Sequence, residues 1–359
     1  MRTGVGKGGR GPARGADAAG LLAGYALDVA FGDPRRFHPV AGYGRAAAAL
    51  ERRLYAPHRA AGAAFTAVAV GVPVAAGVAG ALLTRGRPAA RTALVAAATW
   101  TVLGGRTLRR EAHTMAAHLQ CADLAAARAR LGHLCGRDPT HLGPGELARA
   151  TVESVAENTS DAVVAPLFWG AVAGLPGLLG YRAVNTLDAM VGHRSARYAR
   201  FGTAAARLDD VANLAPSRLT GLLMIGLAPV AGGTRAEALR VWRRDRDDHP
   251  SPNAGQCESA MAGALEVRLG GRNRYFGRTE TRPFLGDGPL PGAGHLTRAA
   301  RLSGAVGVAA VVLAAGIAPV RAAVTRAGGM LRAPASVHGA SAGNGLPLMT
   351  NDDRSVADS

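Results

Sequence analysis

The 359-residue chain has few aromatic residues, almost no lysine and a minority of acidic residues. Phe, Trp and Tyr make up only 4% of the chain, too few for the stacking platforms on which single-stranded nucleic acids are bound. Lys7 is the only lysine, and the other basic residues are arginines spread through every segment rather than gathered in one patch. The net charge of +17 therefore does not indicate a nucleic-acid partner.

Cysteines are also scarce. Cys121, Cys135 and Cys257 cannot form a disulfide framework, and their spacing from nearby histidines fits no zinc module. We expect reduced, structural thiols. The glycine-rich start of the chain lacks the spacing of a phosphate-binding loop, and no signal peptide is recognisable.

Long apolar runs are plentiful despite the charge. Uncharged stretches cover 60–84, 162–181 and 302–320, and about 20 apolar residues suffice to cross the hydrocarbon of a bilayer. Shorter runs cover 18–31, 92–105 and 219–234. The pattern predicts an all-α polytopic integral membrane protein with about four to six membrane helices, some of them re-entrant, and large polar helical loops. The alternative, a soluble protein with buried core helices, does not readily explain three such long runs.

One membrane domain is expected over residues 18–332. A basic tail at 1–17 and a polar tail at 333–359 have the composition of disordered segments. Six full spans would place 25 basic residues on one side of the membrane and 17 on the other, which favours the first side as cytoplasmic only weakly.

Polar clusters beside the apolar runs carry the chemical information, because charged groups at a membrane boundary are costly and tend to be functional. In the first cluster, Asp28 lies within an apolar run and is followed by Asp33 and His38. A helix stop and a turn would explain Gly32 and Pro34, but not Asp28 or His38.

The second cluster places Glu153, Glu157 and Asp161 at a spacing of i, i+4 and i+8. A helix would align these carboxylates on one face, where they repel one another. A bound cation such as Mg²⁺ would relieve the repulsion. A solvated helix face is the alternative explanation.

The third cluster contains Arg182, Asn185 and Asp188, followed by Arg207, Asp209 and Asp210. Guanidinium groups bind phosphate and paired carboxylates bind metal ions, although an internal salt bridge from Arg207 to one Asp would explain the second part equally well. In the fourth cluster, two prolines hold His249, Ser251 and Asn253 on a rigid turn.

At these residues the sequence resembles the CobD/CbiB family of cobalamin biosynthesis, the adenosylcobinamide-phosphate synthases. The stretches that carry the resemblance are ALDVAFGDPRRFHPV (26–40), ATVESVAENTSDAVVAPLFW (150–169), YRAVNTLDAMVGHRSARYARFG (181–202), AARLDDVANLAPSRLT (205–220), HPSPNAG (249–255), AMAGALEVRLGG (260–271) and RYFG (274–277). They follow the family order over residues 18–320. The chain departs from the family at 256–259, where Gln-Cys-Glu-Ser replaces the usual Trp-Pro pair and retains Glu258.

The resemblance implies a multi-pass enzyme of the cell membrane that acts late in the corrinoid pathway. It would join adenosylcobyric acid to aminopropanol or its O-phosphate through an amide bond, at the expense of ATP. Association with other membrane enzymes of the same pathway is a further expectation. Two alternatives remain open: a non-catalytic membrane regulator of the same superfamily, and a corrinoid transporter subunit in which Asp28 couples to an ion.

Residue roles follow from the chemistry of an acyl phosphate, which concentrates negative charge and calls for Mg²⁺ and arginine. The expected metal ligands are Glu153, Glu157, Asp161, Asp209 and Asp210; the phosphate-binding residues are Arg182 and Arg207. His249 or His38 would deprotonate the amine, and Asn158, Asn185 and Asn253 would orient the corrinoid side chain. Asp28, Asp33 and Asp188 are further site residues.

Six full spans would separate residues 182–218 from the other clusters by the thickness of the membrane. Pro166 and Pro176 interrupt the run at 162–181, and Pro229 interrupts the run at 219–234. We therefore predict that both runs are re-entrant or interfacial, so that residues 106–301 all face one side. Because ATP is cytoplasmic, that side is predicted to be the cytoplasm.

Overall fold

The computed structural model describes residues 15–33, 38–193, 195–275 and 278–331. In its first half, the elements are α1 (Ala16–Phe31), α2 (Pro39–Leu54), α3 (Arg59–Leu83), α4 (Pro88–Val102), α5 (Gly105–Gln120), α6 (Leu124–Leu131), α7 (Pro144–Thr159), the π-helix η2 (Ser160–Val164) and α8 (Ala165–Leu187). The second half contains η3 (Asp188–Gly192), α9 (Tyr198–Phe201), α10 (Thr203–Gly226), η4 (Ala228–Ala231), α11 (Arg235–Asp245), α12 (Ala254–Leu265), the strands β1 (Leu269–Tyr275) and β2 (Arg278–Leu285), and α13 (Ala293–Leu331).

The mostly helical membrane fold is confirmed. Within the described residues, three helical segments are long and apolar enough to cross a membrane: Arg59–Leu83, Pro144–Gly192 and Ala293–Arg321. The apolar helices α1 and α4 are shorter, with 16 and 15 residues. The antiparallel hairpin of β1 and β2 was not expected from the sequence.

The segment Pro144–Gly192 is not one straight span, because α8 reverses direction at Gly174. This glycine has φ 69° and ψ −152°, a conformation that essentially only glycine adopts. The Asn185 amide lies 3.3 Å from the Asp161 carboxylate, whereas a straight helix would separate the two residues by about 36 Å. The apolar run at 162–181 therefore enters and returns as a helical hairpin, and both of its ends lie on one side, as a re-entrant segment requires.

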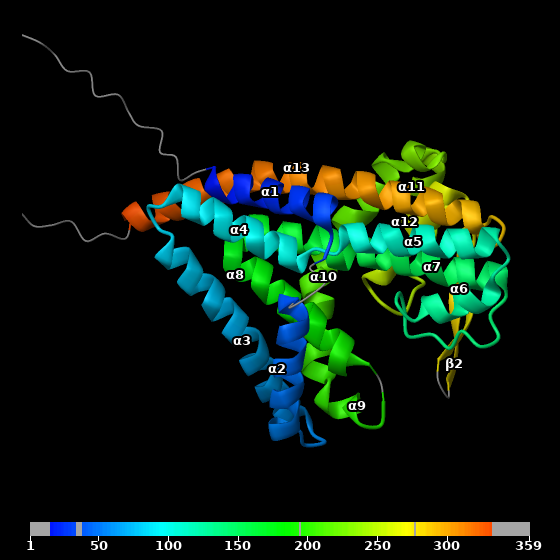
Figure 1. Cartoon of the computed structure of the whole chain (residues 1–359), viewed down its shortest axis with the longest axis horizontal. Helices are drawn as coiled ribbons and strands as arrows, with labels where there is room; N and C mark the ends of the chain where they lie inside the picture. Colours follow the sequence, from blue (N-terminus) through cyan, green and yellow to red (C-terminus); the bar gives the residue numbers. More distant parts are fainter. Residues whose placement is uncertain (1–14, 34–37, 194, 276–277, 332–359) are drawn as a thin grey trace, which may run out of the picture.

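The turn of this hairpin meets three other helices at the end of the bundle away from the polar clusters. Asp17, at the start of α1, pairs with Arg91 of α4 at 2.5 Å and with Arg321 of α13. Arg321 also donates to the carbonyl of Gly170, in the first arm of the hairpin. In Figure 1, α1, α4 and α13 run side by side toward this end.

Asp28 has a structural explanation that the sequence did not reveal. Its carboxylate accepts the backbone N–H of Arg106 in the first turn of α5, at 3.2 Å. In return, the Arg106 guanidinium donates to the carbonyls of Val29 and Ala30 at the end of α1. Each helix thus receives a charge that complements its dipole, and this contact replaces the ion-coupling role considered for Asp28.

The remaining elements form the polar half of the molecule. Helices α5, α6, α7, α11 and α12 pack around one apolar core that continues into α13 and the bundle (Figure 1). The two-stranded hairpin pairs Leu269 with Leu285 at its base, and both residues are fully buried in this core.

The tails predicted at 1–17 and 333–359 fall almost entirely outside the described residues. Helix α1 begins at Ala16, inside the first of these ranges. The single-domain boundary at 18–332 stays a prediction.

Candidate active site

Helix α7 and the π-helix η2 that follows it carry three acidic residues of the candidate site. Glu153 and Glu157 lie on α7, one turn apart, and Asp161 lies in η2. Their surroundings differ sharply: Glu153 is 2% exposed, Asp161 is half-buried and Glu157 is exposed. The predicted row of carboxylates is therefore split between the interior and the exposed surface of the site.

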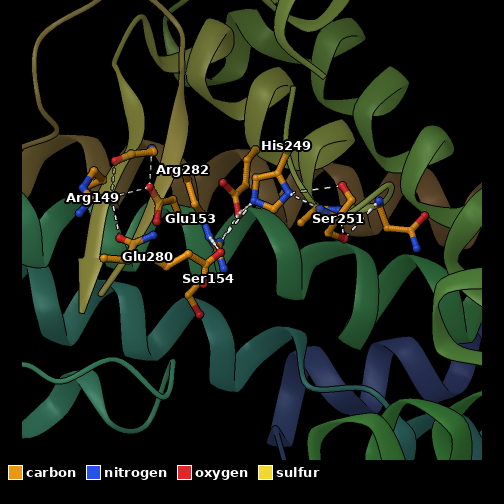
Figure 2. Close-up of polar contacts among 12 residues, drawn as sticks. Arg149, Glu153, Ser154, His249, Ser251, Glu280 and Arg282 are labelled. Carbon is orange, nitrogen blue, oxygen red and sulfur yellow. Dashed lines mark hydrogen bonds and ion pairs between the residues drawn. The ribbon is translucent and has the colours of Figure 1, made fainter. Parts of the chain in front are cut away.

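Glu153 is held in a buried ionic network. Its carboxylate pairs with Arg149 at 3.2 Å and with Arg137, and it accepts the backbone N–H of Gly270 at 2.7 Å. Arg149 also donates to the carbonyl of Arg272, so that this network fastens the β-hairpin to α7 (Figure 2). Two guanidinium groups already balance the charge of Glu153, and we no longer assign this residue to a metal.

An acidic half of the site forms where η2, the second arm of α8 and α10 meet. The Asn185 amide nitrogen lies 3.3 Å from the Asp161 carboxylate and 3.5 Å from that of Asp209, so one amide links the two acids. Asp188 and Asp210 add further negative charge beside them. The reversal of α8 makes this meeting possible, because it returns Asn185 and Asp188 to the level of Asp161.

The environment of Asp209 favours its protonated form. Burial raises the pKa of this carboxyl to about 7, and the neighbouring charge of Asp188 acts in the same direction. Hydrogen bonds from Asn213, at 3.0 Å, and from Asn185 act against the rise. The Asn213 amide oxygen accepts the hydroxyl of Tyr181 at 2.9 Å, which fixes the orientation of the amide.

A second, mixed-charge half lies between α7, α12 and β2. The Nε2 atom of His249 is 3.8 Å from the Glu258 carboxylate and 3.3 Å from a guanidinium nitrogen of Arg282 (Figure 2). Burial lowers the pKa of His249, and the positive charge of Arg282 lowers it further. Glu258 is 1% exposed, and its burial raises its pKa well above the ordinary value, with the charges of Glu153 and Glu157 adding to the rise.

The loop that presents His249 is rigid, as the two prolines suggested. The backbone N–H of Ser251 donates to His249 Nδ1 at 3.0 Å, and the Ser251 hydroxyl accepts the N–H groups of Asn253 and Ala254. The side chain of Asn253 then bonds to the carbonyl of Asp210, at 2.8 Å, and to Ser217. The side chain of Asn253 thus joins this loop to α10.

Glu157 connects the two halves. It is the exposed acid between them and lies within electrostatic range of Arg137 and Arg282 on one side and of Asp161 and Asp188 on the other. The site therefore offers positive charge in one half and negative charge in the other. Such a site suits reactants that carry a phosphate and a cation together.

Arg182 and His38 lie at the bundle side of the acidic half. The Arg182 guanidinium is within electrostatic range of Asp33 and Asp161, and its buried Nε has no hydrogen-bond partner among the residues that the structure describes. Arg182 also lines an apolar pocket of about 120 Å³ between α2, α3, α4 and α8. His38 accepts the N–H of Val40 and so caps α2, and burial lowers its pKa.

Comparison with known proteins now gives the family. The family model described as CobD/Cbib protein matches residues 21–303. The chain belongs to the CobD/CbiB family. It is 54% identical over 301 residues to a protein of Mycobacterium tuberculosis named cobalamin biosynthesis protein CobD, covering 83% of this chain and 94% of the relative. Proteins of the same name from Geobacter metallireducens and Chromobacterium violaceum are 46% and 42% identical, over 74% and 77% of this chain and 86% and 88% of theirs. No solved structure matches the chain.

In this CobD/CbiB chain, two residues that the sequence predicts as members of the site lie apart from its polar groups. Arg207 is exposed and forms no ion pair with Asp209 or Asp210 among the described residues, so the salt bridge weighed for it is absent. Asn158 donates to the carbonyl and the hydroxyl of Ser154, one turn back on its own helix. Neither side chain reaches the acidic half of the site.

The donors of the acidic half suit Mg²⁺ in kind, since they are carboxylate and amide oxygens. Among the described residues, however, no three His, Cys, Asp or Glu side chains converge closely enough to hold a metal ion. Mg²⁺ is commonly bound through one or two carboxylates, with water and substrate phosphates completing its shell. Asp161 and Asp209, linked by Asn185, fit that mode; the five-carboxylate arrangement is not preformed.

Sequence reasoning missed Arg137, Arg282, Tyr181 and Asn213. Arg137, Arg282 and Tyr181 matter through partners at least 16 residues away along the chain, which no local pattern reveals. The bond from Asn213 to Asp209, in contrast, joins residues at a spacing of i, i+4 on one helix and could have been inferred from that spacing. Glu258 was noticed only as a retained residue of the family motif.

Proposed function

We propose that this CobD/CbiB protein, a member of a cobalamin biosynthesis family, joins adenosylcobyric acid to aminopropanol or its O-phosphate in an ATP-dependent amide ligation. The observation that carries the proposal is the bipolar arrangement of charge around Glu157, with arginines on one side and paired acids on the other. A regulator without catalytic activity would have no need to keep these costly buried charges together.

The reaction needs both the positive and the negative groups of the site. A carboxylate is a poor acyl donor, so its oxygen first attacks the γ-phosphate of ATP to give an acyl phosphate and ADP. The amine then attacks the acyl carbon, and phosphate leaves. Arg282 and Arg137 lie where negative oxygens of the phosphate can be stabilised, and Arg182 offers its guanidinium from the opposite side. The cationic amine would approach the acidic half.

Asp161 and Asp209 would hold Mg²⁺, with Asn185 orienting both carboxylates. Bound there together with ATP, the ion would neutralise phosphate charge. Of the three asparagines assigned from the sequence, we retain only Asn185 for substrate or metal orientation. Asp33 and Asp188 would contribute by balancing the charges of Arg182 and of the bound cation.

Glu157 is the best candidate for the group that takes the proton from the amine. His249 contacts Ser251 through Nδ1 and the guanidinium of Arg282 through Nε2, so both of its ring nitrogens are engaged. His38 accepts the N–H of Val40 at Nδ1, and a neutral imidazole in that state carries its proton on Nε2. Neither ring then has a free nitrogen to act as a base. Glu157 is accessible and lies between the two halves, so it can accept the proton and release it to solvent.

We place the site on the cytoplasmic side of the membrane. With α8 folded back, the described residues at the far end of the bundle are the start of α1, the turn between α3 and α4, and the end of α13. They include five basic residues: Arg85, Arg87, Arg91, Arg321 and Arg326. The other 28 basic residues of the described ranges belong to the end that holds the site, and an excess of arginine marks the cytoplasmic side. ATP and the partner enzymes of the pathway are available there.

A corrinoid auxotroph that lacks this step tests the proposal. Cells fed cobinamide should grow without the gene, and cells fed cobyric acid should grow only with it. Asp209→Asn should abolish the rescue, whereas Asp248→Asn, in the exposed part of the same loop as His249, should leave it intact. Failure of the wild-type gene to rescue growth on cobyric acid, with the protein present in the membrane, would disprove the function.

A further inference from the structure

Helix α10 turns several polar side chains inward and several large apolar side chains outward, the reverse of what a helix on the surface of a water-soluble protein shows. Asp209, Asn213 and Ser217 face inward and bond to groups of the site. The exposed side chains include Leu208 (39% exposed), Val211 (64%), Leu214 (40%) and Leu222 (52%), which we call the outer stripe.

The outer stripe is continuous. At about 100° per residue, its four members fall within an arc of about 120° and extend along about 21 Å of the helix. Arg207 and Arg218 lie within the same arc, both exposed. Arg207 is about 160° around the helix from Asp209, which explains why its guanidinium does not join the acidic half of the site.

Lipid is the occupant that this surface fits. Helix α10 packs against α3, α8 and α13, and each of these contains or belongs to a candidate membrane span. The stripe is therefore continuous with surfaces that face the bilayer. Arginines within an apolar surface suit a bilayer boundary, because their stems lie against acyl chains while their charges reach phosphate groups.

Arg207 and Arg218 also indicate how α10 is oriented relative to the membrane. They are eleven residues apart, which corresponds to about 16 Å along a helix. If α10 ran along the membrane normal, one guanidinium would be drawn into the hydrocarbon, at a cost of several kcal/mol. If α10 lies parallel to the membrane plane, both guanidinium groups reach the headgroups.

We propose that α10 is an interfacial helix whose outer stripe rests in the bilayer surface, with Arg207 and Arg218 bound to lipid phosphates. Its inner face then forms a wall of the site at the level of the headgroups. Reactants would reach the site along the membrane surface.

Spin labelling in vesicles tests the proposal on the full-length chain. Cys121, Cys135 and Cys257 are replaced by serine or alanine, and a nitroxide is attached at Val211→Cys or Leu222→Cys. Collision rates with oxygen, which concentrates in lipid, and with a water-soluble nickel complex give the environment and depth of each label. Val312→Cys on α13 serves as the lipid-facing control and Asp247→Cys as the aqueous control.

Both stripe labels should favour oxygen and lie at nearly equal, shallow depth in phosphatidylcholine vesicles that contain phosphatidylglycerol. Arg207→Gln should make the depth of the Val211 label insensitive to phosphatidylglycerol. Strong nickel collisions at both sites would place the stripe in water, and weak collisions with both reagents would place it against protein, including a second copy of this chain. A depth difference of about 16 Å would show a helix that crosses the membrane. Each of these three results overturns the proposal.

Discussion

Glu153 and Glu157 are one turn apart on α7, yet they have different partners. Glu153 is buried between Arg137 and Arg149, whereas Glu157 is exposed. A buried ion pair adds little net stability, but removing one partner leaves an uncompensated charge inside the protein. At the scale of single residues, two glutamates that look equivalent in the sequence therefore have different roles. Glu153 stabilises the fold, and Glu157 is available for the chemistry.

The pair makes a matched test. Glu153→Gln should lower the free energy of unfolding by about 3 kcal/mol, because Arg137 and Arg149 lose their counter-charge. Glu157→Gln should change stability by less than about 0.5 kcal/mol and slow amide formation by about 10²- to 10⁴-fold. Thermal unfolding in detergent and a membrane assay of cobinamide formation measure the two effects. An inactive but stable Glu153→Gln protein, or an unstable Glu157→Gln protein, would contradict the division of roles.

Asp209 should make stability depend on pH. Its pKa is raised to about 7 in the folded protein, so the folded state binds this proton more tightly than the unfolded state does. The stabilisation is present at pH values near or below 4 and is lost as the pH rises through 7. In the presence of EDTA, the wild-type protein should therefore melt at a lower temperature at pH 8 than at pH 5, and Asp209→Asn should remove part of that difference. An unchanged slope in the variant would argue against a buried, protonated Asp209.

At the scale of elements, the reversal of α8 decides which residues can meet. The proline positions suggested a re-entrant segment, but the chain turns at Gly174 and not at Pro166 or Pro176. The reason is conformational: a φ of 69° with ψ near −150° needs glycine, whereas proline holds φ near −65°. The run at 219–234 forms no span of its own, since it ends α10 and continues into η4.

Gly174→Ala should therefore damage the hairpin. A Cβ atom there would approach the Arg321 guanidinium to 2.5 Å, in addition to the backbone strain of about 1 to 3 kcal/mol. Gly71→Ala on α3, where a Cβ meets nothing within 4 Å, is the matched control and should be neutral or slightly stabilising. Yield of folded protein after detergent extraction and its melting temperature report the difference. Equal behaviour of the two variants would mean that the reversal does not depend on Gly174.

At the scale of the whole molecule, the proposed topology has all the polar clusters on one side of the membrane, because α8 folds back at Gly174. Cysteines introduced at Ser195 and Ser251 should thus be labelled from the same face by a reagent that does not cross the bilayer. A cysteine at Arg85, in the exposed turn between α3 and α4, should be labelled only from the opposite face. If Ser195 and Ser251 react from opposite faces, both the re-entrant hairpin and the shared site are wrong.

Much of this protein was readable from its sequence. The long apolar runs predicted a helical membrane protein, because a bilayer demands about 20 apolar residues in a row wherever a helix crosses it. The ordered motifs predicted the family, and their carboxylates and arginines indicated where the polar chemistry gathers. Both inferences depend on residues close together along the chain, where spacing and composition suffice.

Tertiary structure alone decided which of those residues meet. It paired Glu153 with Arg137, engaged Asp28 in capping α5, and brought Arg282 to His249 from a hairpin that no pattern predicted. Each of these outcomes depends on packing between segments at least 16 residues apart along the chain. The role of a charged side chain cannot be assigned without its neighbours, because burial and partners determine whether it binds a ligand or stabilises the fold.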